Sequence, residues 1–426
     1  MSVLVLHRNP LEPFPYREWL TGLEGDVVVL ADRGKILAAG EEPPEGDLGY
    51  ARLEVFDDFD APDVLERALE LAVRHRVTSV IAFHEADVAR AAWLRERLGL
   101  AGAWPRDVLP FRDKLLMKRL AAEHGVEVAP HAVPATAGAA RAFADVHGLP
   151  LVFKERDGFN AIGLRVVREE AELADCLAAL FTGAAPREDV LLEAFVPGRM
   201  CHVDGLVVDG RVAVAWPSQY QYDLSSFGAD PGPRVDLTLD EDDPLTPRLL
   251  ELTDRTLAAL TGGGSRLRDH AFHAEIFHTP DDRLVLCEIA CRPGGAKIRE
   301  VFEVLFGMHL GAYASRAEAG LPLAGLTGPA GSERPRPRAM AGQVLTMKRP
   351  GRVRAVPGVP DEPWVEGFWV YVRPGQVIPR AATSSDFLSA AVASGPSRAE
   401  AERRLRALGE RVLAETVVEA ALEGAS

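Results

Sequence analysis

The chain has 426 residues, enough for two or three domains, and its 47% hydrophobic and 26% charged residues are ordinary for a globular protein. The formal net charge of −15 argues against a nucleic-acid surface but allows a local basic site for phosphates. The start, MSVLVLHRNP, lacks the basic region and cleavage site of a signal peptide, and no segment approaches the roughly 20 apolar residues of a membrane span. We therefore expect a cytoplasmic protein with neither nucleic acid nor membrane as a partner.

Cysteine is sparse, so a disulfide framework is not indicated. We expect all four residues to be reduced and structural: Cys176, Cys201, Cys287 and Cys291.

Residues 1–108 alternate short apolar runs with helical patterns, which is typical of a doubly wound parallel sheet. The expected strands are Val3–Leu6, Asp26–Leu30 and Thr78–Phe83, and the expected helices are 62–75 and 86–97. No GxGxxG follows the first strand, so dinucleotide binding has no support. His84 and Glu85 follow a strand directly, at the edge where open α/β sheets bind ligands. They are candidate substrate contacts, although a plain surface loop is the alternative.

Two lysines stand where they could meet phosphate. Asp113 is predicted to cap a helix over 114–124, and Lys114 then lies in its first turn, where the helix dipole disfavours a cation unless an anion is near. A predicted strand over 149–154 ends on Lys154 and is followed by a glycine-bearing loop, 155–163. Such a loop can cover phosphates with its backbone N–H groups, although it is not a P-loop.

A predicted hairpin, FHAEIFHTPDDRLVLCEIACRPGG, carries the strongest chemical signal. Residues 271–278 and 283–290 alternate around the turn at 279–282. A turn centred between Asp281 and Asp282 places Glu275 opposite Glu288, with Cβ atoms about 4.5–5.5 Å apart. At that distance two carboxylates repel by roughly 3 kcal/mol at an effective dielectric near 20, so a cation is expected between them.

Oxygen ligands without a zinc-type cluster favour Mg²⁺ or Mn²⁺. Arg292 follows close by and could meet an anionic substrate or an oxyanion. The same register pairs Ala274 with Ile289, Ile276 with Cys287 and His278 with Val285. The alternative is a surface hairpin with two solvated glutamates.

The other elements frame this hairpin. Asp209-Gly210 predicts a tight hairpin between strands 201–208 and 211–216, and the polar residues 217–234 are expected to form a substrate-facing lid or an exposed loop. The remaining expectations are a helix over 244–261, helices within 297–325, a linker over 328–338, strands near 342–347, 351–356 and 367–373, and a helix capped by Ser397 that runs from 398 to about 423.

The order of these motifs resembles that of ATP-grasp carboxylate–amine ligases. The motifs are Asp113-Lys114, LPLVFKERDGFNAIG, LLEAFVPG and HAE…EIACRPGG. Within that superfamily the chain resembles most the L-amino acid ligases that make dipeptides, a group related to carnosine synthase. The resemblance covers about residues 1–345 and implies an α/β, in part α+β, ATP-grasp fold. It implies an N-terminal Rossmann-like domain over 1–108, a central lid over 109–210, and a C-terminal α+β domain over 211–426 with a terminal subdomain from about 335.

The resemblance also implies roles for particular residues. ATP would be bound by Lys114 and Lys154, by the loop that carries Gly158, Asn160 and Gly163, and by an adenine pocket at Glu193, Ala194, Phe195 and Val196. Glu275 and Glu288 would bind Mg²⁺ (or Mn²⁺), and Arg292 would stabilise the acyl phosphate and the tetrahedral intermediate. Candidate substrate contacts are His84, Glu85, His273, Tyr220, Tyr222, Gly294 and Gly295.

Two positions depart from the family pattern. Met200 stands where a glutamate often holds the ribose, and Ala290 stands where many members carry an asparagine beside the metal. Ribose must then be held otherwise, and the metal would depend on two carboxylates, phosphates and water.

The implied activity is ATP-dependent joining of an amino acid carboxylate to an amine through an acyl phosphate. One alternative is an ATP-grasp ligase or carboxylase of a metabolic intermediate, as in nucleotide biosynthesis. The other is a nucleotide-binding regulator without catalysis. The oligomeric state is open, with a homodimer as one option.

Overall fold

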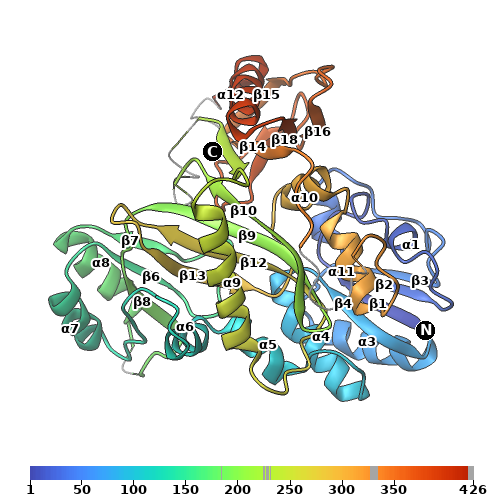
Figure 1. The fold of residues 1–426 in the computed structure, drawn as a ribbon, viewed down its shortest axis with the longest axis horizontal. Helices are drawn as coiled ribbons and strands as arrows, with labels where there is room; N and C mark the ends of the chain where they lie inside the picture. Colours follow the sequence, from blue (N-terminus) through green and yellow to red (C-terminus); the bar gives the residue numbers. More distant parts are fainter. Residues whose placement is uncertain (184, 224–225, 227–229, 231, 327–333, 421–426) are drawn as a thin grey trace, which may run out of the picture.

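Four parallel strands form the N-terminal sheet, as the alternating pattern predicts. The computed structural model describes residues 1–183, 185–223, 226, 230, 232–326 and 334–420 (Figure 1). The sheet has the order β3-β2-β1-β4, from β1 (Ser2–His7), β2 (Val27–Asp32), β3 (Arg52–Phe56) and β4 (Val77–Ala82). Its helices are α1 (Tyr16–Trp19), α2 (Arg33–Ala38), α3 (Pro62–Arg74), α4 (Glu85–Leu98) and α5 (Pro105–Arg112). The half-exposed strand β3 is an addition to the three expected strands.

A second, antiparallel sheet of four strands carries the glycine-bearing loop. Its order is β5-β8-β6-β7, from β5 (His131–Ala132), β6 (Leu151–Glu155), β7 (Arg165–Val167) and β8 (Val190–Ala194). Helices α7 (Ala137–His147) and α8 (Glu170–Leu180) share its apolar core. Before it lies α6 (Lys114–Glu123), whose first N–H groups are capped by Asp113: the carboxylate accepts from the backbone N–H groups of Leu115 and Leu116, as predicted.

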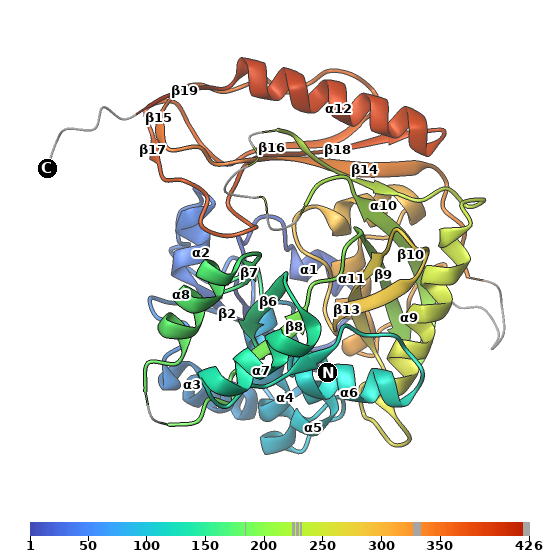
Figure 2. The same cartoon turned by 90° about the vertical axis from the view of Figure 1, so that its left-hand side faces the viewer.

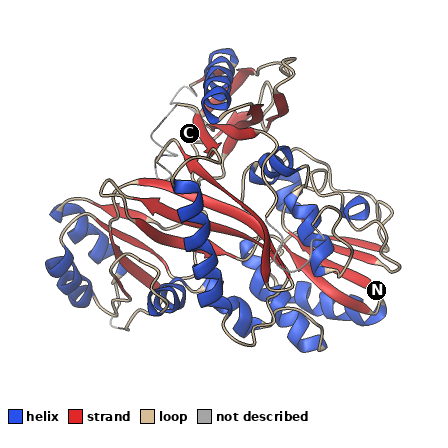
Figure 3. Ribbon diagram, viewed as in Figure 1, coloured by secondary structure: helices blue, strands red, loops and turns tan. Residues whose placement is uncertain are grey.

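An eight-stranded sheet forms the centre of the molecule (Figure 3). Its order is β13-β12-β9-β10-β11-β14-β18-β16, from β9 (Arg199–Val208), β10 (Arg211–Tyr220), β11 (Arg234–Thr238), β12 (His270–His278), β13 (Leu284–Ala290), β14 (Met340–Met347), β16 (Val365–Val370) and β18 (Phe387–Gly395). A small sheet, β17-β15-β19, consists of β15 (Gly351–Ala355), β17 (Val377–Ile378) and β19 (Val417–Glu419).

Helices cover the large sheet on both faces. They are α9 (Leu245–Thr261), α10 (Ile298–Phe306), α11 (Leu310–Glu318) and α12 (Arg398–Glu415). Helix α12 packs on β14 and β18 at the C-terminal end of the fold (Figure 2). None of the described helices combines the length and apolarity that crossing a lipid bilayer requires.

Several expected boundaries differ from the structure. Strand β10 continues to Tyr220, so the expected lid over 217–234 begins later, and 224–225, 227–229 and 231 lie outside the described residues. The same holds for 328–333 of the expected linker. Helix α12 starts at its Ser397 cap, as expected, but ends at Glu415 rather than near 423. Strand β9 belongs to the large sheet rather than to the sheet of the central subdomain. We therefore propose that this subdomain, expected over 109–210, ends near residue 195.

The hairpin of β12 and β13 has the expected central pair. Glu275 is paired with Glu288, and Ala274 with Ile289. Beyond them a β-bulge shifts the register by one residue, so the expected pairs Ile276–Cys287 and His278–Val285 are wrong: the partners are Leu286 and Leu284. The turn closes one residue earlier than expected, because the Thr279 N–H donates to the Arg283 carbonyl. The bulge at Cys287 then shifts the register back, so that Glu275 is paired with Glu288.

The centre of the sheet tolerates no side chain at Gly205, which gives a first prediction. A Cβ there would lie 2.4 Å from the Val214 carbonyl oxygen and 2.6 Å from a ring carbon of Phe272. Gly205→Ala should lower the free energy of unfolding by about 1–3 kcal/mol, because the sheet must shift to make room. Thermal unfolding measures the effect. Gly263→Ala is the control, since nothing lies within 4 Å of its Cβ position. Equal midpoints for the two variants would contradict the packing.

Candidate active site

The two facing glutamates are partly buried, and Glu288 lines a pocket. The Glu275 side chain is 17% exposed and the Glu288 side chain 36%. Each has one basic neighbour at 3.5 Å: His273 Nε2 beside Glu275, and Lys114 Nζ beside Glu288. Two carboxylates on one face, with one open side, are a donor set that fits Mg²⁺, which prefers a few carboxylates completed by phosphate and water oxygens.

The lysine in the first turn of α6 has the anionic neighbour that its position requires. Besides its contact with Glu288, Lys114 Nζ donates to the carbonyl oxygen of Gly158 in the glycine-bearing loop. A phosphate in this pocket would meet the same ammonium group. The residues expected to bind phosphate from α6 and from the loop are therefore adjacent in space.

The second lysine is held by a buried carboxylate. Lys154 Nζ lies 2.8 Å from Glu193 Oε2, and Lys118 Nζ lies 2.8 Å from Glu193 Oε1. Lys118 also donates to the Cys287 carbonyl at 2.9 Å and is fully buried. Burial would raise the pKa of Glu193, but the two ammonium groups outweigh it and hold that pKa at about 2. Sequence reasoning missed Lys118, although its spacing of four residues from Lys114 places both on one face of α6.

The glycine-bearing loop closes one side of the pocket. Asn160 and Gly163 have φ values of 53° and 71°, which bend the chain back between β6 and β7. Phe159 meets the ring of His84 edge-on, with ring centroids 5.4 Å apart. His84 caps α4 by accepting from the Ala86 N–H, so this candidate substrate contact has a structural role as well. A small pocket remains, lined by Glu85, Phe111, Arg112, Lys114, Met117, Gly158, Phe159, Asn160, His273, Glu288, Ile289, Ala290 and Arg292.

Glu85 holds the arginine that was expected to stabilise anions. Arg292 Nε lies 2.6 Å from Glu85 Oε2, and Arg112 Nη1 pairs with the other carboxylate oxygen. Burial opposes the negative charge of Glu85, but both guanidinium groups lower its pKa to about 2. Arg112 also donates to the Asp157 carbonyl at 2.7 Å and so links Glu85 to the loop. Arg112 was not anticipated, because only the tertiary fold brings α5 beside β13.

The strand expected at the adenine is present, but several of its polar groups already have partners within the protein. The Ala194 N–H donates to Pro130 O, and the Phe195 N–H to Pro150 O. The Glu193 side chain is directed to the two lysines rather than to a base. Val196, which follows this strand, is the other residue expected at the adenine. The adenine-binding role of residues 193–196 stays a prediction.

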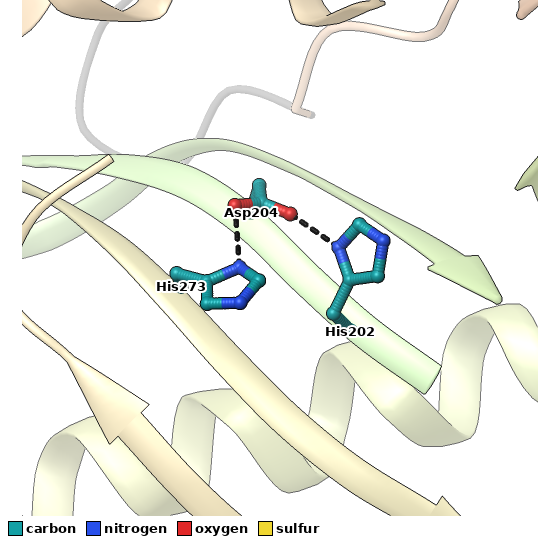
Figure 4. Close-up of side chains that lie close together, drawn as sticks. All are labelled: His202, Asp204 and His273. Carbon is teal, nitrogen blue, oxygen red and sulfur yellow. Dashed lines mark hydrogen bonds and ion pairs between the residues drawn. The ribbon is translucent and has the colours of Figure 1, made fainter. Parts of the chain in front are cut away.

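A cluster of histidine and aspartate beside Glu275 was also missed. Figure 4 shows Asp204 between two rings: His202 Nδ1 lies 2.5 Å from Oδ2, and His273 Nδ1 lies 2.9 Å from Oδ1. Tyr220 packs on His202 with ring centroids 4.6 Å apart, and Tyr222 lies beside Tyr220. The signal in the sequence is an HxD on β9 and an HxE on β12, which become neighbours because these strands pair.

This cluster is suited to hydrogen bonding rather than to a metal ion, although the ligand atoms lie within 4.8 Å of one another. The second nitrogen of His202 meets Asp236 at 3.0 Å, and that of His273 faces Glu275. Burial would lower both pKa values, but the carboxylates on both sides raise the pKa of His202 to about 10 and that of His273 to about 9. Each ring thus faces a carboxylate at both of its nitrogens, which engages them in hydrogen bonds and ion pairs rather than leaving them for a metal ion.

Comparison with known proteins places this site in context. Residues 343–417 match the family model "L-amino acid ligase C-terminal domain 2". An L-arginine-specific L-amino acid ligase from Bacillus subtilis is 24% identical over 234 residues, which span 54% of this chain and about half (55%) of that relative.

Two solved structures align over almost the whole chain. An L-amino acid ligase from Bacillus licheniformis has a TM-score of 0.75 at 17% identity, covering 99% of this chain and 98% of that one. The biotin carboxylase domain of a 2-oxoglutarate carboxylase from Hydrogenobacter thermophilus, solved with MgADP, has a TM-score of 0.68 at 16% identity, covering 98% and 90%. The chain therefore has the ATP-grasp fold, as the order of its motifs predicts, and it is similar to L-amino acid ligases.

Proposed function

We propose that the protein is an ATP-dependent carboxylate–amine ligase, which joins an amino acid to an amine and releases ADP and phosphate. The observation that carries the proposal is the pair of facing glutamates: Glu275 is paired with Glu288, which lines one pocket together with Lys114 and Arg292. The similarity to L-amino acid ligases supports the substrate class.

The chemistry divides among the groups around the pocket. Lys114 and Lys154 bind the phosphates of ATP and offset the charge that develops as the γ-phosphoryl group moves to the substrate carboxylate. Glu275 and Glu288 would hold Mg²⁺, which when bound polarises phosphate oxygens and neutralises their charge. ADP and an acyl phosphate result.

The second step forms the amide bond. The amine of the second substrate attacks the acyl carbon, the carbon–oxygen bond to phosphate breaks, and the amine loses a proton. Arg292, oriented by Glu85, stabilises the oxyanion and the departing phosphate.

A carboxylase or ligase of a phosphorylated intermediate is less well supported. Such a substrate brings several negative charges and needs free basic groups. Beside the hairpin, however, basic residues are few. Arg292 is held by Glu85 at 2.6 Å, Lys297 lies 3.1 Å from Glu300, and Arg299 lies over the ring of Phe14, 4.4 Å from its centre. A regulator without catalysis could bind MgATP through the same glutamates, but it would not need Arg292 for an oxyanion.

Removal of either glutamate should abolish turnover. Glu275→Ala and Glu288→Ala are expected to lower amino-acid-dependent ADP release by about 100-fold or more, because the metal site would lose half of its protein ligands. ADP is measured by a coupled assay with pooled amino acids. The control is Asp281→Asn at the exposed hairpin turn, which should leave ADP release unchanged. Near-normal turnover in the glutamate variants would contradict the metal assignment.

Product analysis tests the reaction itself. The protein is incubated with ATP, Mg²⁺ and a panel of amino acids, including arginine, and condensed products are identified by mass spectrometry. With an ¹⁸O-labelled carboxylate, an acyl phosphate predicts one labelled oxygen in the released phosphate. Unlabelled phosphate alongside a labelled amide product would contradict that intermediate.

Glu193→Gln tests whether the buried carboxylate positions the lysines. The variant leaves Lys118 and Lys154 without a counter-ion, so we expect a loss of about 3 kcal/mol or more in unfolding free energy and a higher KM for ATP. The native pKa of Glu193 is lowered from 4.5 to about 2, so its stabilisation is complete above about pH 4.5 and lost toward pH 2.

The difference between wild type and variant, followed by denaturant unfolding, should therefore be constant from about pH 5 to about pH 8 and shrink below about pH 4.5. Glu170→Gln, which breaks an exposed pair with Arg141, is the control and should change little. A Glu193→Gln variant as stable as this control would contradict the role of the buried carboxylate.

A further inference from the structure

A chain of buried polar side chains crosses the large sheet behind Glu275. From His273 it passes to Asp204 and His202, and then to Asp236, which accepts a hydrogen bond from Gln343 Nε2 at 2.9 Å. Gln343 Oε1 in turn accepts from the Lys297 backbone N–H at 2.8 Å. The chain thus begins beside Glu275, a proposed metal ligand, and ends in the loop that follows Arg292.

The strand register explains why these residues form one row. Glu275 is paired with His202 on β9, and His202 is paired with Ser218 on β10. Two residues further along β10, on the same face, Tyr220 is paired with Asp236, which is paired with Gln343 on β14. Directly paired residues share a face of the sheet. The row therefore runs across the strands, from the metal hairpin to the C-terminal part of the fold.

Burial makes this row costly. The four residues between His273 and Lys297 are at most 3% exposed: His202, Asp204, Asp236 and Gln343. A buried ionic chain is often no more stable than well-packed apolar residues of the same volume. Stability alone is therefore a weak reason for charged residues here, whereas their fixed directions suit the orientation of a neighbouring site.

Asp204 connects both sides of the proposed active site. Through His273 it fixes the ring that faces Glu275. It also lies against the turn after Arg292: a Cβ on Gly294 would be 2.6 Å from Asp204 Oδ1. One carboxylate thus contacts the support of the metal ligand and the backbone near the proposed oxyanion-binding arginine.

We propose that Asp204, backed by His202, Asp236 and Gln343, is a positioning residue that holds Glu275 and the loop 292–297 in one geometry for binding of metal and nucleotide. The proposal rests on the proposed function, since it requires that Glu275 binds a metal ion. Asp236 and Gln343 act only through His202 and Asp204 and contact no reacting atom.

Asp236→Asn is the informative variant, because it removes the charge behind His202 and keeps the shape of the side chain. Binding of Mn²⁺ to the protein with ADP, measured by electron paramagnetic resonance without turnover, should weaken about 10-fold. Gln343→Met tests the same chain at its far end, should the first variant fail to fold, and should weaken Mn²⁺ binding in the same direction.

Ser389→Ala is the matched control. Ser389 forms a 2.6 Å hydrogen bond with Thr346 on the neighbouring strand, and both residues are 2% exposed. This variant also removes a buried hydrogen bond from the large sheet, but it has no path to Glu275. It should lower the thermal midpoint without changing Mn²⁺ affinity.

The outcomes distinguish failure of the positioning role from failure of the proposed function. Mn²⁺–ADP binding equal to that of wild type in both Asp236→Asn and Gln343→Met would overturn the positioning role. Wild-type protein that bound no Mn²⁺ with ADP would overturn the proposed function as well. Nitrogen coupling from two imidazoles in the pulsed spectrum would overturn both, by placing the metal on His202 and His273.

Discussion

Two carboxylates that face each other across β12 and β13 are the constraint on which the rest of this molecule depends. Glu275 and Glu288 stand in direct register, where their mutual repulsion is roughly 3 kcal/mol at an effective dielectric near 20. His273 on one side and Lys114 on the other offset part of this cost, each at 3.5 Å. In the proposed function a divalent cation with phosphate oxygens would offset the remainder, and three of the four sheets bring groups for such a ligand to this place.

The basic groups around the glutamates are held in advance by acidic partners. Glu193 forms an ion pair with Lys154, and Glu85 forms one with Arg292. Both cations are therefore held in place before any ligand binds. Fixed charges of this kind lower the cost of reorganisation during phosphoryl transfer and at an oxyanion. The price is two carboxylates buried in the protein, each of which depends on two cationic partners.

Much of this arrangement could be predicted from sequence because it is local. The cap at Asp113, the hairpin turn at Asp209-Gly210 and the alternation around Glu275 each depend on neighbours a few residues away. The predicted pairing of Glu275 with Glu288 is confirmed, although the turn from which it was derived is one residue off. The bulge at Cys287 restores the register between them. A bulge has no reliable sequence signature, so Leu286 could not be foreseen as the partner of Ile276.

What could not be predicted is long-range. Lys118 reads as one more charge on a helix, and only the fold shows it buried against Glu193. The contact of His202 with Asp236 depends on which strands pair across the sheet, which composition does not reveal. The small residues of β18, Ser-Ala-Ala-Val-Ala-Ser, carry little strand propensity and form a strand because β14 and β16 flank them.

The position of the metal tests this account most directly. In crystals grown with Mn²⁺ and a non-hydrolysable ATP analogue, the anomalous signal of manganese locates the ion independently of the protein. The account predicts a peak within coordination distance of oxygens from both Glu275 and Glu288 and of the analogue's phosphates. A peak at His202 and His273, or one remote from both glutamates, would contradict it.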